Sequence, residues 1–402
     1  MAVATDHEVY YDPYDAETWS DPYPVFRRLR DEAPLYYNEP YDFYAVSRFA
    51  DVERGLVDRE TFLSCRGDIL EMIKAAIKGE LEIPPGTLIF EEPPTHTIHR
   101  ALLSRLFTPK QMSRLESKVR DFCQRRLDLF VGADTFNFVS DLGMQIPMRV
   151  ISLLLGIPES EQEAIRDHFE QTMRSEPGKP MEVNDTLDGG LFADYIDWRH
   201  DHPSDDLMTL LLTAEFEDER GTMRRLTRDE VLTFVTVLAG AGNETTNRLF
   251  GWMGKLLGEN PDIRHELVED RSLIPNTIEE IRRYEPISQI VGRYVGRDVD
   301  LHGQTVKEGS VMLFLLGSAN RDERVFPDSD RFDIYRKIGH HLGFGYGPHF
   351  CLGASLARLE GRVGLDEVLN RFPDWEVDSS KTAFRMLSVS GRGWDSMPVF
   401  LT

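Results

Sequence analysis

The sequence predicts a mainly α protein with a small β region, folded as one domain over residues 1–402. The first observation is a capped and largely apolar stretch between residues 227 and 258. As a helix of roughly 30 residues it would be about 45 Å long, enough to cross a whole domain. The second is a mostly helical pattern over residues 121–216. The third is that strand-like segments are short and few, so only a small part of the chain is expected to form strands.

Composition restricts the class of protein. Of 402 residues, 41% are hydrophobic and 29% charged, which is an ordinary globular balance. The net charge of −23 argues against nucleic acid or an anionic membrane as a partner. Three scattered cysteines do not make a disulfide framework, and the first residues lack an export signal. We therefore expect a cytoplasmic protein that does not bind membranes. We also expect a monomer.

The N-terminal part begins with a helix within residues 21–33 that ends before Pro34. Two aromatic-rich strands, at 35–37 and 43–46, follow around a turn. Residues 66–93 contain several prolines and one short helical stretch at 69–77. We interpret this as a long, mobile segment, and long loops in compact domains tend to be functional.

A helix is predicted to open at Thr95, directly after two prolines. His96 and Arg100 are four residues apart and so share one helical face, which for an isolated pair is usually a solvated face. Residues 100–120 carry six basic residues against one acidic residue in an otherwise acidic chain. Of these, the residues downstream of Arg100 are Arg105, Lys110, Arg114, Lys118 and Arg120.

Helical patterns continue to residue 216, with a stop at 156–158 and an interruption at 174–190. His200 and His202 flank Asp201, so a metal site is conceivable. Because they lie beside Pro203 in a charged loop, we expect them to be solvated.

The long central helix opens with the capping box Thr227-x-x-Glu230. Its middle contains two glycines, at 240 and 242, each costing about 1 kcal/mol relative to alanine. Without Cβ atoms at these two positions, a flat molecule could lie against the helix, or the helix could widen locally. Glu244 and Thr245 follow directly, and buried polar groups of this kind are costly unless they are used or hydrogen-bonded.

A further helix at 278–284 ends before Pro286 and places Glu280 three residues before Arg283. Such pairs usually decorate a surface and contribute a few tenths of a kcal/mol. The alternative register pairs Glu279 with Arg282. Strands are predicted at 287–295 and 311–316, and paired strands between 384 and 400.

A glycine-rich loop, residues 344–353, precedes the last predicted helix. Gly345 and Gly347 suit tight turns with positive φ. Cys351 stands at the start of the helix, where peptide N–H groups lower the pKa of a thiol and favour the metal-binding thiolate. The alternative is an ordinary buried cysteine.

The spacing Phe-x-x-Gly-x-His-x-Cys-x-Gly in this loop closely resembles the heme-ligand loop of the cytochrome P450 family, the heme-thiolate monooxygenases. Membrane-bound members of the family carry an N-terminal anchor, and none is predicted here, so the chain resembles the soluble bacterial members. The resemblance implies heme b between the central helix and the loop, with Cys351 as the iron ligand. The cofactor-binding residues it implies are His96, Arg100, Ala241, Arg293, Phe344, Gly345, His349, Cys351 and Gly353.

Two more motifs match the family. The segment Ala239–Thr246 resembles its oxygen-activating motif, which implies Glu244 and Thr245 as an acid–alcohol pair for proton delivery. Glu280 and Arg283 match a buried structural Glu-x-x-Arg, and Arg331 matches the arginine that joins the pair.

The resemblance implies a monooxygenase that uses O2 and oxidises a small molecule. Candidate pocket residues are mostly apolar, so a terpenoid, steroid or fatty acid derivative is favoured over a polar substrate. These residues are Val237, Ala241, Ile287, Ile290 and Val291, with the segments 66–93, 170–195 and 387–390.

Electrons must come from a partner, because the chain has no flavin or nicotinamide motif. We expect an acidic ferredoxin with its reductase, bound at the basic residues between 105 and 120. Two alternatives are a heme-thiolate sensor without turnover and a peroxide-driven peroxygenase. The Glu244–Thr245 pair argues against both, because neither needs a proton relay.

Overall fold

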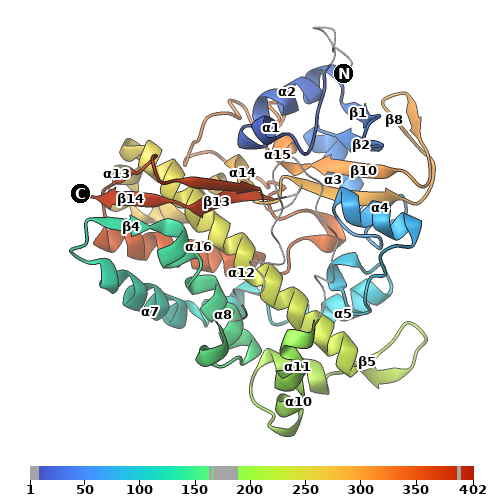
Figure 1. Cartoon of the computed structure of the whole chain (residues 1–402), viewed down its shortest axis with the longest axis horizontal. Coiled ribbons are helices and arrows are strands. Elements are labelled where there is room, and N and C mark those ends of the chain that lie inside the picture. The colour runs from blue at the N-terminus through green and yellow to red at the C-terminus, as the bar shows by residue number, and fades with distance from the viewer. Residues whose placement is uncertain (1–8, 163–164, 166–188, 387–390) are drawn as a thin grey trace.

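The computed structural model is organised around one helix, α12 (Arg228–Glu259), which runs diagonally through the molecule (Figure 1). It describes residues 9–162, 165, 189–386 and 391–402. The capping box predicted at Thr227 and Glu230 is present in both directions. At 32 residues the helix is about 48 Å long. It is α-helical through both glycines, so the widening suggested by the sequence does not form.

Helices pack around α12 along most of its length. Its direct neighbours include the π-helix η3 (Phe138–Gly143), α8 (Ile146–Leu155), α14 (Ile274–Tyr284) and α16 (Ala354–Arg371). Gly156 ends α8 in the left-handed conformation, as the stop in the sequence indicates. The run Phe138–Leu155 has the length and apolar composition of a membrane span, yet 61% of it is buried inside the protein. Because most of this run is covered by other described residues, it belongs to the protein core and does not span a membrane.

The main sheet has five strands in the order β1-β2-β10-β7-β3 and lies on one side of α12 (Figure 1). All neighbours are antiparallel except β2 and β10, which are parallel. Its strands are β1 (Leu35–Asn38), β2 (Phe43–Val46), β3 (Phe62–Leu63), β7 (Ile290–Val295) and β10 (Val311–Leu315). In β7, Arg293 lies opposite Met312 of β10.

Smaller sheets complete the β region. The C-terminal part forms the hairpin β12–β13 beside α12 and the strand β14, which pairs with both β11 and β4. The bounds are β4 (Thr135–Asn137), β5 (Glu215–Glu217), β6 (Met223–Arg225), β8 (Val299–Leu301), β9 (Gln304–Val306), β11 (Trp375–Val377), β12 (Ala383–Met386), β13 (Arg392–Ser396) and β14 (Pro398–Leu401).

The remaining helices are short. The helix predicted before Pro34 is α2, and the 66–93 segment holds α4 and the 3₁₀ turn η1. The bounds of the α-helices are α1 (Ala16–Ser20), α2 (Tyr23–Glu32), α3 (Phe49–Val57), α4 (Leu70–Lys78), α5 (Thr95–Ser104), α6 (Pro109–Ser113), α7 (Glu116–Leu127), α10 (Ala193–Asp201), α11 (Leu207–Thr213), α13 (Pro261–Glu269) and α15 (Leu316–Ala319). The 3₁₀ turns are η1 (Leu88–Phe90), η2 (Asp128–Phe130), η4 (Glu159–Glu161), η5 (Gly189–Phe192), η6 (Arg271–Leu273) and η7 (Gly347–His349).

Candidate heme site

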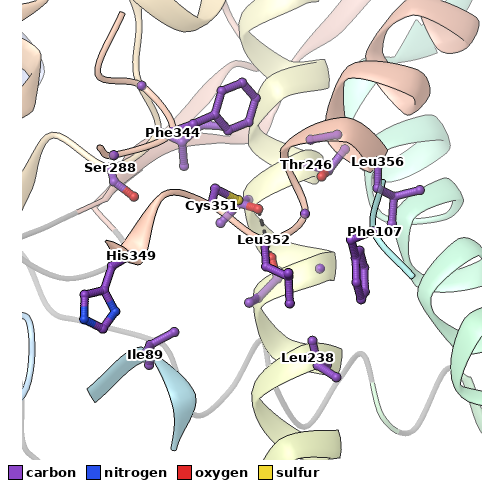
Figure 2. A pocket seen from close by; sticks show the side chains of 18 of the residues that line it. Ile89, Phe107, Leu238, Thr246, Ser288, Phe344, His349, Cys351, Leu352 and Leu356 are labelled. Carbon is purple, nitrogen blue, oxygen red and sulfur yellow. Dashed lines mark hydrogen bonds between the residues drawn. The ribbon is translucent and has the colours of Figure 1, made fainter. Parts of the chain in front are cut away.

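A cavity of about 270 Å³ lies between the middle of α12 and the loop that precedes α16. Figure 2 shows Cys351 on this loop, facing α12, with His349 and Ile89 on one side and Phe107 and Leu356 on the other. Apolar side chains dominate the lining. The cavity therefore has the shape and chemistry of a site for a mostly apolar body.

The loop is folded so that it presents the Cys351 thiol to the cavity. Gly345 and Gly347 have φ values of +68° and +70°, as predicted. A Cβ atom on Gly347 would lie 2.8 Å from the carbonyl oxygen of Leu56. The Cys351 amide donates to the Phe344 carbonyl at 2.8 Å, which closes the loop.

The protein groups around Cys351 act on the pKa of its thiol in opposite directions. Burial raises the pKa of the thiol, and this effect outweighs the lowering by Arg282, the Gly353 amide and Arg100. The start of α16 alone therefore does not produce a thiolate. Positive charge nearby must stabilise that form, and a metal ion at the sulfur is the most direct source.

Two buried histidines lie together beside the cavity: His349 lines it, and His96 packs against the His349 ring. The rings of His96 and His349 have centroids 4.2 Å apart, and the Nε2 atom of each is buried without a partner. Burial lowers the pKa of His96 to about 4 and that of His349 to about 3, so both rings are neutral at pH 7. Orphaned buried nitrogens of this kind indicate a polar ligand that is not part of the chain.

Two arginines join these histidines. Arg100 of α5 donates to the Phe350 carbonyl, and Arg293 of β7 is buried and donates to the Gly292 carbonyl at 2.8 Å. Burial lowers the pKa of Arg293, an effect that Asp68 and Glu92 oppose. Two neutral imidazoles and two guanidiniums beside an apolar cavity fit a flat hydrophobic group that carries carboxylates. Heme with its propionates is such a group.

Helix α12 contributes the opposite wall. Ala241 and Thr245 line the cavity, and the Thr245 hydroxyl donates to the Ala241 carbonyl at 2.9 Å. Glu244 does not line the cavity, although the sequence places it beside Thr245. Its buried carboxylate forms an ion pair with Arg248, which also donates to Asp395 at 2.8 Å. Successive helical residues point about 100° apart, and Glu244 is turned away from the cavity toward Arg248.

Behind the ligand loop, Glu280 and Arg283 of α14 are fully buried and joined by two hydrogen bonds of 2.7 Å. Glu279, the partner in the alternative register, binds Arg358 instead. The prediction that Arg331 joins the pair is wrong. Its side chain is 67% exposed and binds Asp333.

The arginine that reaches Glu280 is Arg336, at 3.3 Å. The physical reason is the turn that precedes it. The Asp333 amide donates to Glu280 at 3.0 Å and anchors the chain there, so the residue three positions later faces the carboxylate.

Of the expected pocket residues, Val237, Ala241, Ile287 and Val291 line the cavity. Ile290 does not. It lies beside Val291 in β7, and neighbouring strand residues point to opposite faces. Its side chain is buried in a separate cluster with Leu313 and Leu315. The expected contributions of segments 170–195 and 387–390 lie largely or wholly outside the described residues, whereas Leu88 and Ile89 bring the 66–93 segment to the cavity.

Several lining residues were not identified from the sequence. Glu360 of α16 has one oxygen without a partner, and burial raises its pKa well above the usual range. Arg282 reaches the cavity from α14. Helical spacing from Leu356, four residues earlier in α16, could have indicated Glu360, but nothing local to the sequence indicates Arg282. His200 is exposed and binds Asp201, and no metal-binding cluster occurs among the described residues.

A helical fold with a cysteine loop facing the longest helix, and carboxylate-binding groups at the cavity edge, defines a heme-thiolate protein. Residues 182–388 match the family described as cytochrome P450. The putative cytochrome P450 123 of Mycobacterium tuberculosis is 36% identical, over 98% of this chain and 97% of that protein. The chain therefore belongs to the cytochrome P450 family, as the sequence predicted. It is a monooxygenase whose cofactor is heme b.

Solved structures agree with this assignment. A mutant of P450 EryK in complex with erythromycin B has a TM-score of 0.85 and 29% identity, covering 95% of this chain and 96% of that one. CYP109E1 from Bacillus megaterium in complex with testosterone has a TM-score of 0.84 and 28% identity, covering 96% and 99%. The mainly α fold with small sheets is thus the fold of the family.

Proposed function

We propose that this enzyme oxidises a hydrophobic small molecule of the terpenoid, steroid or fatty acid class, with O2 and electrons from a ferredoxin and its reductase. The observation that carries the substrate class is the lining of the cavity opposite Cys351. Val237, Ile287, Val291 and Leu88 are apolar, so a polar substrate would lose its hydration without gaining partners. The testosterone complex of CYP109E1 supports a substrate of this kind.

We propose that Cys351 binds the heme iron and that His96, Arg100, Arg293 and His349 bind its propionates. When bound, the heme supplies the iron that activates oxygen, and a thiolate ligand favours O–O cleavage. The two neutral histidines would donate from Nε2, the atoms left without partners. The two arginines would add charge to this recognition, since hydrogen bonds between ionised groups are stronger than neutral ones.

Proton delivery is assigned to Thr245, which lines the cavity. In its present rotamer this hydroxyl donates to the Ala241 carbonyl, which leaves its lone pairs available to accept from water. Glu244 would act from behind α12. Glu244 binds Arg248, which in turn binds the partly exposed carboxylate of Asp395, so a chain of polar groups leads from Glu244 toward solvent.

The electron donor is assigned to the face that carries α5, α6 and α7. Four basic residues there are exposed and form no ion pair with a described residue: Arg105, Lys110, Arg114 and Lys118. Arg120, the fifth residue of the predicted cluster, binds Asp366 and Glu367 instead. Arg100 contacts the ligand loop, so this face lies near Cys351. An acidic ferredoxin would complement it. We further propose a cytoplasmic monomer in which residues 1–402 form one domain.

The axial ligand is tested by the carbon monoxide complex of the reduced protein. The wild type should give the strongly red-shifted Soret band of thiolate ligation, and Cys351→Ala should lose it. Cys65→Ala and Cys123→Ala are matched controls that should keep it. A normal spectrum from Cys351→Ala would rule out the proposal.

Substrate class and turnover need a second experiment. Titration with steroids, terpenoids, fatty acids and polar analogues should give Soret shifts only with the hydrophobic compounds. NADPH-dependent product formation with a ferredoxin and reductase should exceed turnover on peroxide alone. No turnover with either system would favour a sensor, and turnover on peroxide alone would favour a peroxygenase.

A further inference from the structure

Arg282 of α14 is a buried cation that lines the same cavity as Cys351. The residue is only 6% exposed. Its guanidinium lies over the Phe344 ring, 3.9 Å from the centroid, and Nη2 donates to the Gly343 carbonyl at 2.5 Å. The Nε atom is buried and has no partner. The side chain is therefore held against the start of the loop that presents Cys351.

No carboxylate among the described residues forms an ion pair with Arg282. The adjacent acids are already engaged, because Glu279 binds Arg358 at 2.7 Å and Glu280 binds Arg283 at 2.7 Å. Burial lowers the pKa of Arg282 to about 10, so the group is still charged at pH 7. A buried charge without a counter-ion costs several kcal/mol. A nearby anion is needed to offset this cost.

Cys351 is the nearby group that can supply this anion. Both side chains line the same cavity, and Cys351 becomes an anion when it binds a metal ion. The geometry is fixed on both sides, since Arg282 holds Gly343 and Phe344 while the Cys351 amide binds the Phe344 carbonyl.

We propose that Arg282 is a built-in counter-ion of the Cys351 thiolate and raises the reduction potential of the heme iron. This inference rests on Cys351 as the axial ligand. A positive charge close to the thiolate withdraws electron density from the iron and stabilises the form with one more electron. Because the site is buried, this Coulomb effect is larger than it would be at the surface. Arg282 thereby favours electron transfer from the external donor.

Arg358 provides a matched control within the same structure. Its guanidinium also lies over Phe344, 4.5 Å from the ring centroid, and it too acts on Cys351. However, its side chain is 36% exposed and its charge is balanced by two hydrogen bonds to Glu279, at 2.7 and 2.8 Å. Because solvent screens a partly exposed charge, removing this arginine should change the electrostatics at Cys351 less than removing the buried Arg282.

The test is the midpoint potential of the holoprotein, measured by spectroelectrochemistry on Arg282→Leu, Arg282→Gln, Arg282→Lys and Arg358→Leu. Arg282→Leu should lower the equilibrium constant for one-electron reduction by about tenfold, a shift of about 59 mV to more negative potential. Arg282→Gln keeps a donor for the Gly343 carbonyl without the charge and should shift in the same direction. Arg282→Lys should recover most of the wild-type value, and Arg358→Leu should shift least.

The outcomes separate this inference from the proposed ligand. A wild type without the thiolate carbon monoxide spectrum would refute Cys351 as the ligand. If that spectrum is normal and Arg282→Gln has the same potential as the wild type or as Arg282→Lys, the counter-ion role is refuted. The Gln and Lys pair gives this answer even if Arg282→Leu fails to bind heme.

Discussion

Glu280 and Arg283 form a fully buried ion pair in which two nitrogens of the guanidinium each donate at 2.7 Å to one carboxylate oxygen. The three remaining donors of Arg283 bind the carbonyls of Asn320, Ser329 and Arg331. Every strong hydrogen-bonding direction of the pair is thereby satisfied inside the protein. The pair fixes α14 to the chain that leads into the cysteine loop.

Removing one partner of this pair should be severely destabilising. Glu280→Ala leaves the Arg283 charge buried and uncompensated, a loss of about 3–5 kcal/mol in the free energy of unfolding. Urea unfolding of the holoprotein measures the loss, and failure to obtain folded holoprotein agrees with it. Arg331→Ala is the control, because that side chain is exposed, and it should cost less than about 0.5 kcal/mol.

Arg336→Ala distinguishes the two arginines directly. Its side chain is almost fully buried against Glu280 and donates to three carbonyls of the preceding turn, so it should cost clearly more than Arg331→Ala. Equal, small losses for both variants would contradict the arrangement.

Thr245 should control how reducing equivalents are used. Thr245→Val keeps the shape of the side chain but removes the hydroxyl at the cavity, so heme binding and NADPH consumption should persist while product per NADPH falls several-fold. More peroxide or water should form instead. The measurement is product, peroxide and NADPH in one assay, with Thr245→Ser as the control that retains the hydroxyl. Unchanged coupling in Thr245→Val would reduce Thr245 to a packing residue.

Glu279 should make the free energy of unfolding fall as the pH is lowered below about 4.5. Burial alone would raise its pKa, but hydrogen bonds from Arg358 and His341 hold it at about 2. Since the unfolded value is about 4.5, the unfolded chain binds more protons, and stability from this group is complete above pH 4.5 and lost as pH falls toward 2. Between pH 5 and pH 3 the loss is about 2 kcal/mol.

The check is urea unfolding of wild type and Glu279→Gln at pH 5, 4 and 3. The difference in the free energy of unfolding between the two proteins should shrink as the pH falls. A difference that stays constant over this range would show that Glu279 does not titrate as its contacts require.

Local chemistry explains which parts of this fold were predictable. The capping box at Thr227 and the positive φ of Gly345 and Gly347 depend on neighbouring residues alone, and both are present. The motif around Cys351 lies within ten consecutive residues, so the family could be named from the sequence alone. The order of helices and the paired strands near the C-terminus follow from hydrophobic period and turn residues.

The errors concern contacts made across the fold. Arg331 and Arg336 both lie in the same segment, and only the turn anchored by the Asp333 amide on Glu280 decides which arginine faces that carboxylate. Ile290 and Val291 are equally apolar, and only the pleat of β7 decides which faces the cavity. The burial of Arg282 could not be predicted, because the Cys351 loop that it contacts is about 70 residues away in the sequence.

The basic residues on α5, α6 and the start of α7 should govern reduction by the external donor. We expect the double variant Arg105→Glu and Arg114→Glu to slow ferredoxin-driven reduction and to flatten its dependence on ionic strength. Electron-transfer interfaces are small and weak, so charge acts mainly on the rate of association. Dithionite, which needs no docking surface of this kind, should reduce wild type and variant at the same rate.

A matched control reverses two exposed arginines elsewhere, Arg225 and Arg297, and changes the net charge by the same amount. Both already bind surface acids, so their loss should cost at most about 1 kcal/mol of stability. If this control slows ferredoxin-driven reduction as much as the first variant, net charge is responsible and the location of the basic residues is not. If the first variant accepts electrons at the wild-type rate at every salt concentration, these residues form only a solvated surface. A slowing confined to Arg105→Glu and Arg114→Glu, and lost at high salt, places the donor on the side of the protein that carries Cys351.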